Sequence, residues 1–119
     1  MARILIVDDS PTERYYLSEM LVRAGYAVLT AQDGADALAQ LKQARLDLIL
    51  MDVVMPGANG FQITRAIARD PELQDVPVII CSSKSQETDR IWGLRQGARD
   101  YLVKPVVEAE LLAKIAAIS

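Results

Sequence analysis

Polar side chains that could handle a metal ion and a phosphoryl group follow the most apolar runs of the sequence. Asp8 and Asp9 come directly after the first run, Asp52 after the second, Ser82 after the third and Lys104 after the fourth. Carboxylates are hard oxygen ligands, and without histidine in the chain they indicate Mg2+ or Mn2+. A hydroxyl and an ammonium beside them could contact phosphoryl oxygens. The runs are Ile4-Leu5-Ile6-Val7, Leu48-Ile49-Leu50-Met51, Val78-Ile79-Ile80-Cys81 and Tyr101-Leu102-Val103.

Each run is apolar throughout rather than alternating, which is typical of a strand buried on both faces of a parallel sheet. Ligands of open parallel sheets bind beyond the carboxyl ends of the strands. The five polar side chains therefore predict one shared site at that edge of the sheet.

Strand-like and helix-like segments alternate along the chain, which predicts an α/β fold with a doubly wound, five-stranded parallel sheet and five helices. We predict strands over residues 3–7, 27–30, 47–51, 78–82 and 100–103. The first, third and fourth are the most apolar and should be central. Right-handed crossovers then give the strand order 2-1-3-4-5.

The first helix has the clearest start signal. Ser10 can cap it, Pro11 suits its first position, and Glu13 would complete a capping box with Ser10. Its predicted core face includes Ala24, and Gly25 ends it. The other helices are predicted over about 34–44, 60–70 and 86–96, and from 108 onward.

The predicted helix over 86–96 carries an apolar face and a lone tryptophan. We expect Ile91 and Leu94 to face the core, with Trp92 on the opposite side. Trp92 either packs into the domain after all or serves as a docking anchor, because exposed aromatic residues are favoured at interfaces.

Composition excludes several classes of function. The chain has 119 residues, a net charge of −3, one cysteine and no histidine. The absence of histidine excludes Ser-His-Asp and Cys-His catalysis, histidine-ligated zinc and a phosphohistidine role. The net charge argues against non-specific binding to nucleic acid, and no apolar stretch is long enough for a membrane span. Cys81 lies in a predicted strand and fits a reducing, cytoplasmic setting.

Asp52 is the predicted nucleophile of the site. The following Pro56-Gly57 and Asn59-Gly60 pairs mark a tight loop that would present Asp52 at the mouth of the site. A carboxylate held beside a metal ion and an ammonium can attack phosphorus, and Lys104 and the metal would balance the developing charge.

The motifs together resemble the bacterial response-regulator receiver domain of the CheY kind, over residues 4–118. The stretch 86–100 resembles the stand-alone regulators of type IV pilus twitching motility (the PilG/PilH kind). The matching motifs are Val7-Asp8-Asp9-Ser10, Met51-Asp52-Val53-Val54-Met55-Pro56 with Gly60, Val78-Ile79-Ile80-Cys81-Ser82 and Lys104-Pro105.

The resemblance implies a role for each site residue. Asp52 would be the phosphoacceptor, and Asp8 and Asp9 would bind Mg2+ together with Asp52 and the backbone carbonyl of Val54. Lys104 would contact the phosphoryl group. The switch pair would be Ser82 and Tyr101.

The family mechanism implied is phosphoryl transfer from a sensor histidine kinase, catalysed by the receiver itself, which is not otherwise an enzyme. The switch would reshape the face formed by the last two helices and the last strand, where a downstream protein binds. Val54 and Lys84 occupy the positions that tune phosphoryl lifetime. We expect residues 1–119 to form one receiver domain with no attached output domain.

Other functions stay open at this point. The receiver could instead drain phosphoryl groups from another regulator. A haloacid-dehalogenase-type phosphatase would need a second acid two residues after Asp52, where this chain has Val54. A flavodoxin would need a phosphate loop rich in hydroxyls and glycines after the first strand, and a degenerate receiver would lack part of the site.

Overall fold

Five strands and five helices alternate along residues 2–118, which the computed structural model describes. None of these helices combines the length and apolar character that crossing a bilayer requires. The elements are β1 Arg3–Val7, α1 Pro11–Arg23, β2 Ala27–Ala31, α2 Gly34–Gln43, β3 Leu48–Met51, α3 Gly60–Arg69, β4 Val78–Ser82, α4 Glu87–Arg95, β5 Asp100–Val103 and α5 Glu108–Ile118.

The strands form one parallel sheet in the order β2-β1-β3-β4-β5, as the sequence predicts. Every residue of β3 and β4 is buried, whereas most of β2 is only half-buried. The strand order reverses between β1 and β3, which are direct neighbours with Val7 paired to Met51. Such a switch point is where open α/β sheets place their ligand sites.

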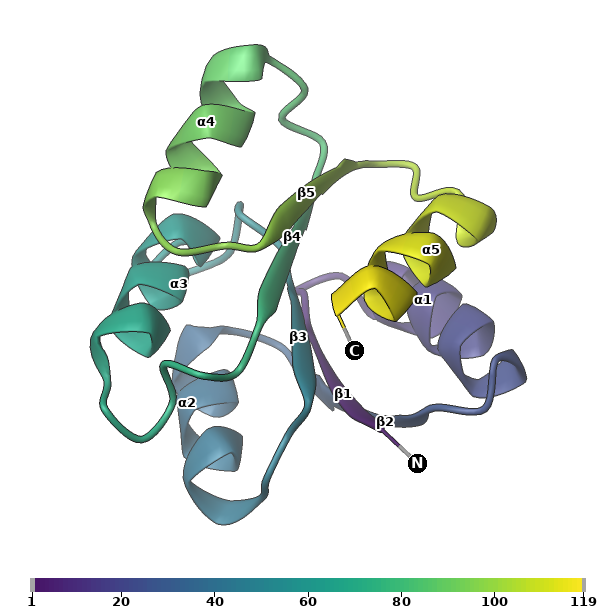
Figure 1. Cartoon of the computed structure of the whole chain (residues 1–119), viewed down its shortest axis with the longest axis horizontal. Coiled ribbons are helices and arrows are strands. Elements are labelled where there is room, and N and C mark those ends of the chain that lie inside the picture. Colours follow the sequence, from purple (N-terminus) through teal and green to yellow (C-terminus); the bar gives the residue numbers. More distant parts are fainter. Residues whose placement is uncertain (1, 119) are drawn as a thin grey trace.

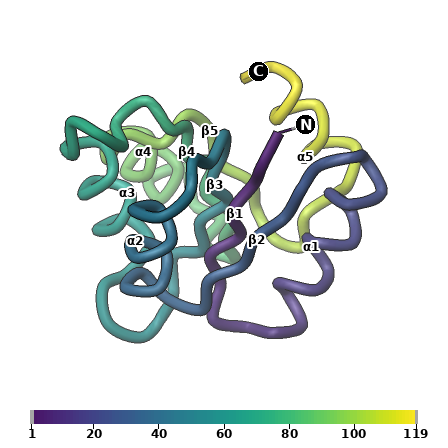
Figure 2. Tube along the Cα trace, turned by 90° about the horizontal axis from the view of Figure 1, so that it is seen from below, coloured from purple at the N-terminus to yellow at the C-terminus, as the bar shows by residue number. Residues whose placement is uncertain are grey.

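The helices cover both faces of the sheet. α1 and α5 lie on one face, and α2, α3 and α4 on the other (Figures 1 and 2). Because successive strand side chains point to opposite faces, each central strand contributes to two separate cores. The core under α1 and α5 includes Ile4, Ile6, Leu17, Leu21, Leu50, Ile79, Cys81, Leu111 and Ile115. The core under α2, α3 and α4 includes Leu5, Val7, Ile49, Met51, Ile63, Ile67, Ile80 and Tyr101.

Side-chain caps start three of the helices near the carboxyl ends of the strands. Asn59 caps α3 and forms a full capping box with Gln62, with bonds of 3.0 and 2.8 Å. Ser10 caps α1 by accepting a 3.2 Å bond from the Glu13 amide. The predicted reciprocal bond, in which Glu13 would accept the Ser10 amide, is absent, because that amide donates to Asp8 Oδ1 at 2.9 Å instead. Asp33 caps α2.

Some predicted core faces were wrong in detail. α1 ends at Arg23, and Ala24 is exposed. Ile91 on α4 is 42% exposed, and the buried residue of that helix is Gly93. Trp92 is 49% exposed, so it does not pack into the domain. In α3 the sequence reasoning missed Ile63, which is buried.

Candidate functional site

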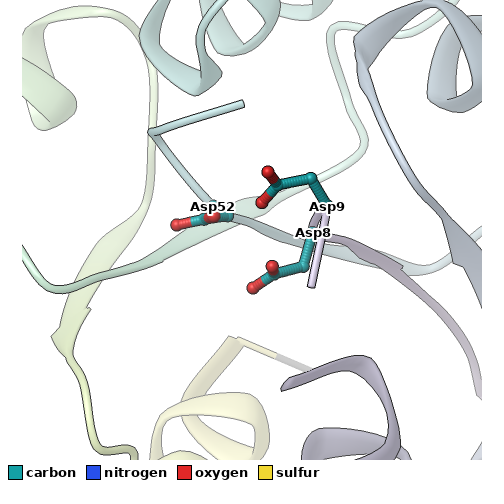
Figure 3. A group of neighbouring side chains, drawn as sticks. All are labelled: Asp8, Asp9 and Asp52. Carbon is teal, nitrogen blue, oxygen red and sulfur yellow. The ribbon is translucent and has the colours of Figure 1, made fainter. Parts of the chain in front are cut away.

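Three aspartates meet beyond the carboxyl ends of β1 and β3. Asp8 and Asp9 follow β1, and Asp52 follows β3 (Figure 3). One carboxylate oxygen from each lies within 4.8 Å of the others. Asp8 and Asp52 are buried, whereas Asp9 is exposed. The arrangement matches the predicted cluster and leaves one side of it open to solvent.

Lys104 reaches the cluster from the end of β5. Its Nζ lies 2.7 Å from Asp8 Oδ2 and 3.3 Å from Asp52 Oδ1. The peptide bond between Lys104 and Pro105 is cis. The two distances show that a single ammonium contacts the carboxylates that follow two different strands. They confirm that the chain brings Asp8, Asp52 and Lys104 together.

Backbone hydrogen bonds fix Asp8 at the end of its strand. Its amide donates to the Ala31 carbonyl at 3.1 Å, which continues the β1–β2 pairing by one residue. Its Oδ1 accepts the Ser10 amide, and its own carbonyl accepts a 2.7 Å bond from Arg14 Nη1. The Asp8 carboxylate therefore has one oxygen committed to the backbone and the other to Lys104.

Asp52 is held in the same way. Its amide donates to the Val7 carbonyl at 2.9 Å, and its Oδ1 accepts the Val53 amide at 2.9 Å. The start of α3 presses against its backbone. A Cβ at Gly60 would overlap the Asp52 carbonyl oxygen and lie 2.8 Å from the carbonyl carbon. This close approach is the physical reason for glycine at the first position of α3.

The electrostatics of the site oppose ionisation of Asp52. Burial raises the pKa of Asp52 and the charge of Asp8 raises it further, while Lys104 and the Val53 amide act in the opposite direction and do not compensate. Burial alone would lower the pKa of Lys104, but its hydrogen bond to Asp8 and the charges of Asp52 and Asp8 raise it. Three carboxylates facing one ammonium leave excess negative charge at this point.

That excess charge suits a divalent cation. The donor set consists of carboxylate oxygens, which Mg2+ and Mn2+ prefer, and the open side next to Asp9 leaves room for the waters that Mg2+ retains. A cation here would also remove the repulsion that raises the pKa of Asp52. The residues present therefore fit the predicted metal.

Ser82 and Tyr101, the predicted switch pair, lie on the last two strands, Ser82 at the end of β4 and Tyr101 within β5. Ser82 is fully buried, and its Oγ accepts the Lys84 amide at 3.1 Å. The Tyr101 hydroxyl donates to the Lys84 carbonyl at 2.7 Å. The Lys104 amide donates to the Ser82 carbonyl at 2.9 Å. Ser82 and Tyr101 are therefore linked through the backbone of Lys84. The ends of β4 and β5 are linked by the Lys104 amide.

Two further predicted positions are exposed to solvent. Val54, two residues after Asp52, has a side chain that is 61% exposed. Lys84, two residues after Ser82, is also exposed. Neither side chain joins the buried cluster, so both could meet a molecule approaching from solvent.

Two contacts that support the site were not predicted from the sequence. Arg14 binds the Asp8 carbonyl, and a charged residue one turn into a helix gives no sequence signal for that role. Gly60 belongs to the motif around Asp52, but the sequence marks it only by its place in a tight loop and gives no sign of its close approach to the Asp52 carbonyl.

The sequence matches the family described as the response regulator receiver domain over residues 4–116. It is 58% identical to Protein PilH of Pseudomonas aeruginosa, over 99% of this chain and 98% of that protein. It is 40% identical to the response regulator PleD of Caulobacter vibrioides, over 96% of this chain but only 25% of PleD.

Solved structures give the same result. The chemotaxis protein CheY4 of Vibrio cholerae superimposes with a TM-score of 0.93 at 35% identity, covering 100% of this chain and 99% of CheY4. The response regulator TrrA of Thermotoga maritima, solved in complex with Mg2+ and BeF, gives a TM-score of 0.89 at 31% identity over 100% of both chains.

Proposed function

The chain belongs to the response regulator receiver domain family and is a phosphorelay response regulator of the CheY kind, and from that premise we propose that Asp52 is its phosphoacceptor. One observation carries the proposal. The Lys104 ammonium lies 2.7 Å from Asp8 and 3.3 Å from Asp52, beyond the strand ends where the aspartates meet. This puts a buried nucleophilic carboxylate beside a fixed positive charge.

The reaction is transfer of a phosphoryl group from a phosphohistidine of a sensor histidine kinase. A carboxylate oxygen of Asp52 forms a bond to phosphorus, the P–N bond of the donor breaks, and the imidazole nitrogen keeps the electron pair. Lys104 then turns its ammonium toward the phosphoryl oxygens and balances their charge. Water later attacks the same phosphorus, the bond from the Asp52 oxygen to phosphorus breaks, inorganic phosphate leaves, and the Asp52 carboxylate is regenerated.

The proposed metal ligands are the carboxylates of Asp8, Asp9 and Asp52 and the backbone carbonyl of Val54. Receiver domains bind Mg2+ at their acidic pocket, and the oxygen donors of this cluster support Mg2+, with Mn2+ as a substitute. When bound, the ion would neutralise charge that builds up on the phosphoryl oxygens.

The proposed switch is the pair Ser82 and Tyr101. A phosphoryl group on Asp52 would draw the Ser82 hydroxyl toward it, away from the Lys84 amide. The loop after β4 would follow, and Tyr101, which donates to the Lys84 carbonyl, would repack. Phosphorylation would act as a population shift between two states that differ locally at this loop.

The proposed output surface is the face formed by α4, β5 and α5. It exposes apolar side chains, among them Ile91 at 42%, Trp92 at 49% and Val103 at 44%. We propose Trp92 as a docking anchor for a downstream protein. Trp92→Ala should weaken binding of that partner while leaving phosphorylation unchanged, and a loss of phosphorylation or folding would refute the anchor.

The match to PilH supports a place in type IV pilus twitching motility or a chemotaxis-like pathway, with a cytoplasmic location. The receiver family makes this a signalling protein rather than an enzyme with an external substrate, and we propose that it catalyses only its own phosphorylation and dephosphorylation. A second role, draining phosphoryl groups from another regulator, uses the same chemistry. One receiver domain accounts for residues 4–116.

The decisive experiment is incubation with acetyl phosphate and Mg2+, followed by intact mass measurement. The wild type should gain one phosphoryl group, and Asp52→Asn should gain none. The matched control is Asp75→Asn, because Asp75 is an exposed aspartate in the loop before β4. A phosphoryl adduct that persists in Asp52→Asn would refute the assignment.

A further inference from the structure

The Tyr16 hydroxyl ties α1 to the chain segment that begins with Lys104. Residues 104–107 connect β5 to α5 and are called the β5–α5 link below. The Tyr16 hydroxyl donates a 2.8 Å hydrogen bond to the Val106 carbonyl of this link, between residues 90 positions apart in the sequence. The Tyr16 side chain is 43% exposed. Because the ring adds little to the core, the hydrogen bond is the contact that distinguishes this side chain.

The backbone of Lys104 lies between two directed hydrogen bonds. On one side its own amide donates to the Ser82 carbonyl at 2.9 Å. On the other side Pro105 has no amide to donate, and the Val106 carbonyl accepts from Tyr16. The Val106 side chain is buried in the core under α1 and α5. Burial is non-directional, whereas a hydrogen bond also fixes the direction of the carbonyl.

The same helix holds the strand end that carries Asp8. Arg14 Nη1 donates to the Asp8 carbonyl at 2.7 Å, and Arg14 lies on α1 two residues before Tyr16. Asp8 Oδ2 and Lys104 Nζ are 2.7 Å apart. α1 and α5 lie on the same face of the sheet (Figure 1). α1 therefore contacts both chain segments that form this ion pair, one through Arg14 and the other through Tyr16.

The hydrogen bond from Tyr16 gains importance when the ion pairs of Lys104 are given up. In the resting structure the ammonium is held by Asp8 at 2.7 Å and by Asp52 at 3.3 Å. In the proposed reaction the ammonium turns toward the phosphoryl oxygens, and its position then depends on where the backbone places the side chain. A displacement of about 1 Å at a reacting centre costs on the order of a hundredfold in rate.

We propose that Tyr16 is a positioning residue for Lys104. Its hydroxyl holds the Val106 carbonyl against α1 and so keeps the ammonium within reach of a phosphoryl group on Asp52. The inference rests on the proposed roles of Asp52 and Lys104. Tyr16 acts through the backbone of the β5–α5 link and is not one of the proposed ligands of the metal or contacts of the phosphoryl group.

The test is Tyr16→Phe, which removes the hydroxyl and keeps the ring. We expect phosphorylation by acetyl phosphate to slow about fivefold, the factor that corresponds to about 1 kcal/mol for one hydrogen bond. The Mg2+ dissociation constant, measured by calorimetry without phosphodonor, should stay unchanged, because Arg14 still holds Asp8. A wild-type rate would overturn the proposal. An equal loss of Mg2+ affinity would also overturn it, since the whole site would then have moved.

The matched control is Tyr15→Phe. Tyr15 precedes Tyr16 on α1 and is 68% exposed, so this variant loses the same hydroxyl from a side chain that faces solvent. It should phosphorylate at the wild-type rate. Equal slowing in both variants would contradict a specific role for Tyr16.

A second control concerns the other contact between α1 and α5. Arg23 Nη2 lies 2.6 Å from Glu108 Oε1, at the first residue of α5. Both side chains are exposed, and such a pair contributes little to stability. Arg23→Met should therefore keep the wild-type rate. If it slows phosphorylation as much as Tyr16→Phe, the packing of α1 on α5 positions Lys104 and the Tyr16 hydroxyl does not.

A double-mutant cycle identifies the residue through which Tyr16 acts. In a Lys104→Met background, followed over a longer incubation, Tyr16→Phe should change the residual phosphorylation rate by less than about twofold, because the residue that it positions is gone. The same fivefold slowing in both backgrounds would overturn the inference. If Lys104→Met takes up no phosphoryl group, the comparison of the two tyrosine variants decides. A wild type that takes up none would instead defeat the proposed function.

Discussion

Gly60→Ala tests whether the start of α3 sets the position of the acceptor. The new Cβ would overlap the Asp52 carbonyl oxygen and lie 2.8 Å from the Asp52 carbonyl carbon and 2.9 Å from Val53 Cα. Carbon atoms pack at about 3.5–4.0 Å, so the α3 backbone and the Asp52 backbone would have to separate by roughly 1 Å. All three obstructing atoms belong to the backbone, so a change of rotamer cannot relieve the overlap.

The size of the effect follows from that displacement. Overpacking of this kind costs about 1–3 kcal/mol, which corresponds to a melting temperature lower by about 10 °C at the upper end. A functional group must be held within about 0.5 Å, and an error of about 1 Å costs on the order of a hundredfold in rate. We therefore expect Gly60→Ala to remain folded at low temperature but to accept a phosphoryl group from acetyl phosphate about 10–100 times more slowly.

Gly34→Ala is the matched control. Gly34 is also buried and also the first residue of its helix, α2. A Cβ there would overlap the Cδ1 and Cγ1 atoms of the Ile63 side chain, which can change rotamer, and would lie an ordinary 3.9 Å from the nearest backbone atom, the Ala58 carbonyl oxygen. This variant should lose some stability and keep the wild-type phosphorylation rate below its melting temperature. If Gly60→Ala also phosphorylates at the wild-type rate, the close approach of α3 does not position Asp52.

Three further predictions concern other parts of the molecule. Val54→Asn should speed dephosphorylation about tenfold, because an amide can orient the attacking water where valine has no polar atom; an unchanged or slower rate, measured by loss of the mass adduct, would contradict this. Burial raises the pKa of the Cys81 thiol to about 12, so the native protein should not react with a thiol reagent at pH 8 until it is unfolded. Burial alone would raise the pKa of Asp100, but its 2.9 Å pairing with Lys114 and a backbone amide lower it overall. The stability from this pair is full above the ordinary aspartate pKa of about 3.9 and is lost as the pH falls below it, so Lys114→Met should abolish about 1 kcal/mol or less of acid-sensitive stability in urea unfolding between pH 5 and about pH 3.

The sheet and the site were predictable for the same reason. Apolar runs without alternation mark strands buried on both faces, and a parallel sheet then brings the residues after each strand to one edge. Asp8, Asp52 and Lys104 could be assigned to one site because the residue after a strand is fixed by the strand itself. Strand bounds differed by one residue, at Ala31 and Asp47, where pairing rather than composition decides the end.

Helix faces were harder to predict. In α4 the apolar residue Ile91 is exposed and Gly93 is buried, since Tyr101 and Ile80 take the space that a side chain at position 93 would need. Helix periodicity cannot detect this, because it depends on where a neighbouring strand places its side chains. The capping box predicted at the start of α1 is incomplete for a related reason: the sequence pattern is present, but Asp8 Oδ1 rather than Glu13 accepts the Ser10 amide.

The hydrogen bond from the Lys104 amide to the Ser82 carbonyl extends the pairing of β4 and β5 by one rung. The spacing between a hydroxyl-bearing and an amine-bearing residue is thereby set by the main chain, whatever the connecting loops contain. An engineer who wished to graft this constellation onto another scaffold would therefore need adjacent parallel strands of matching register, and could redesign the loops freely.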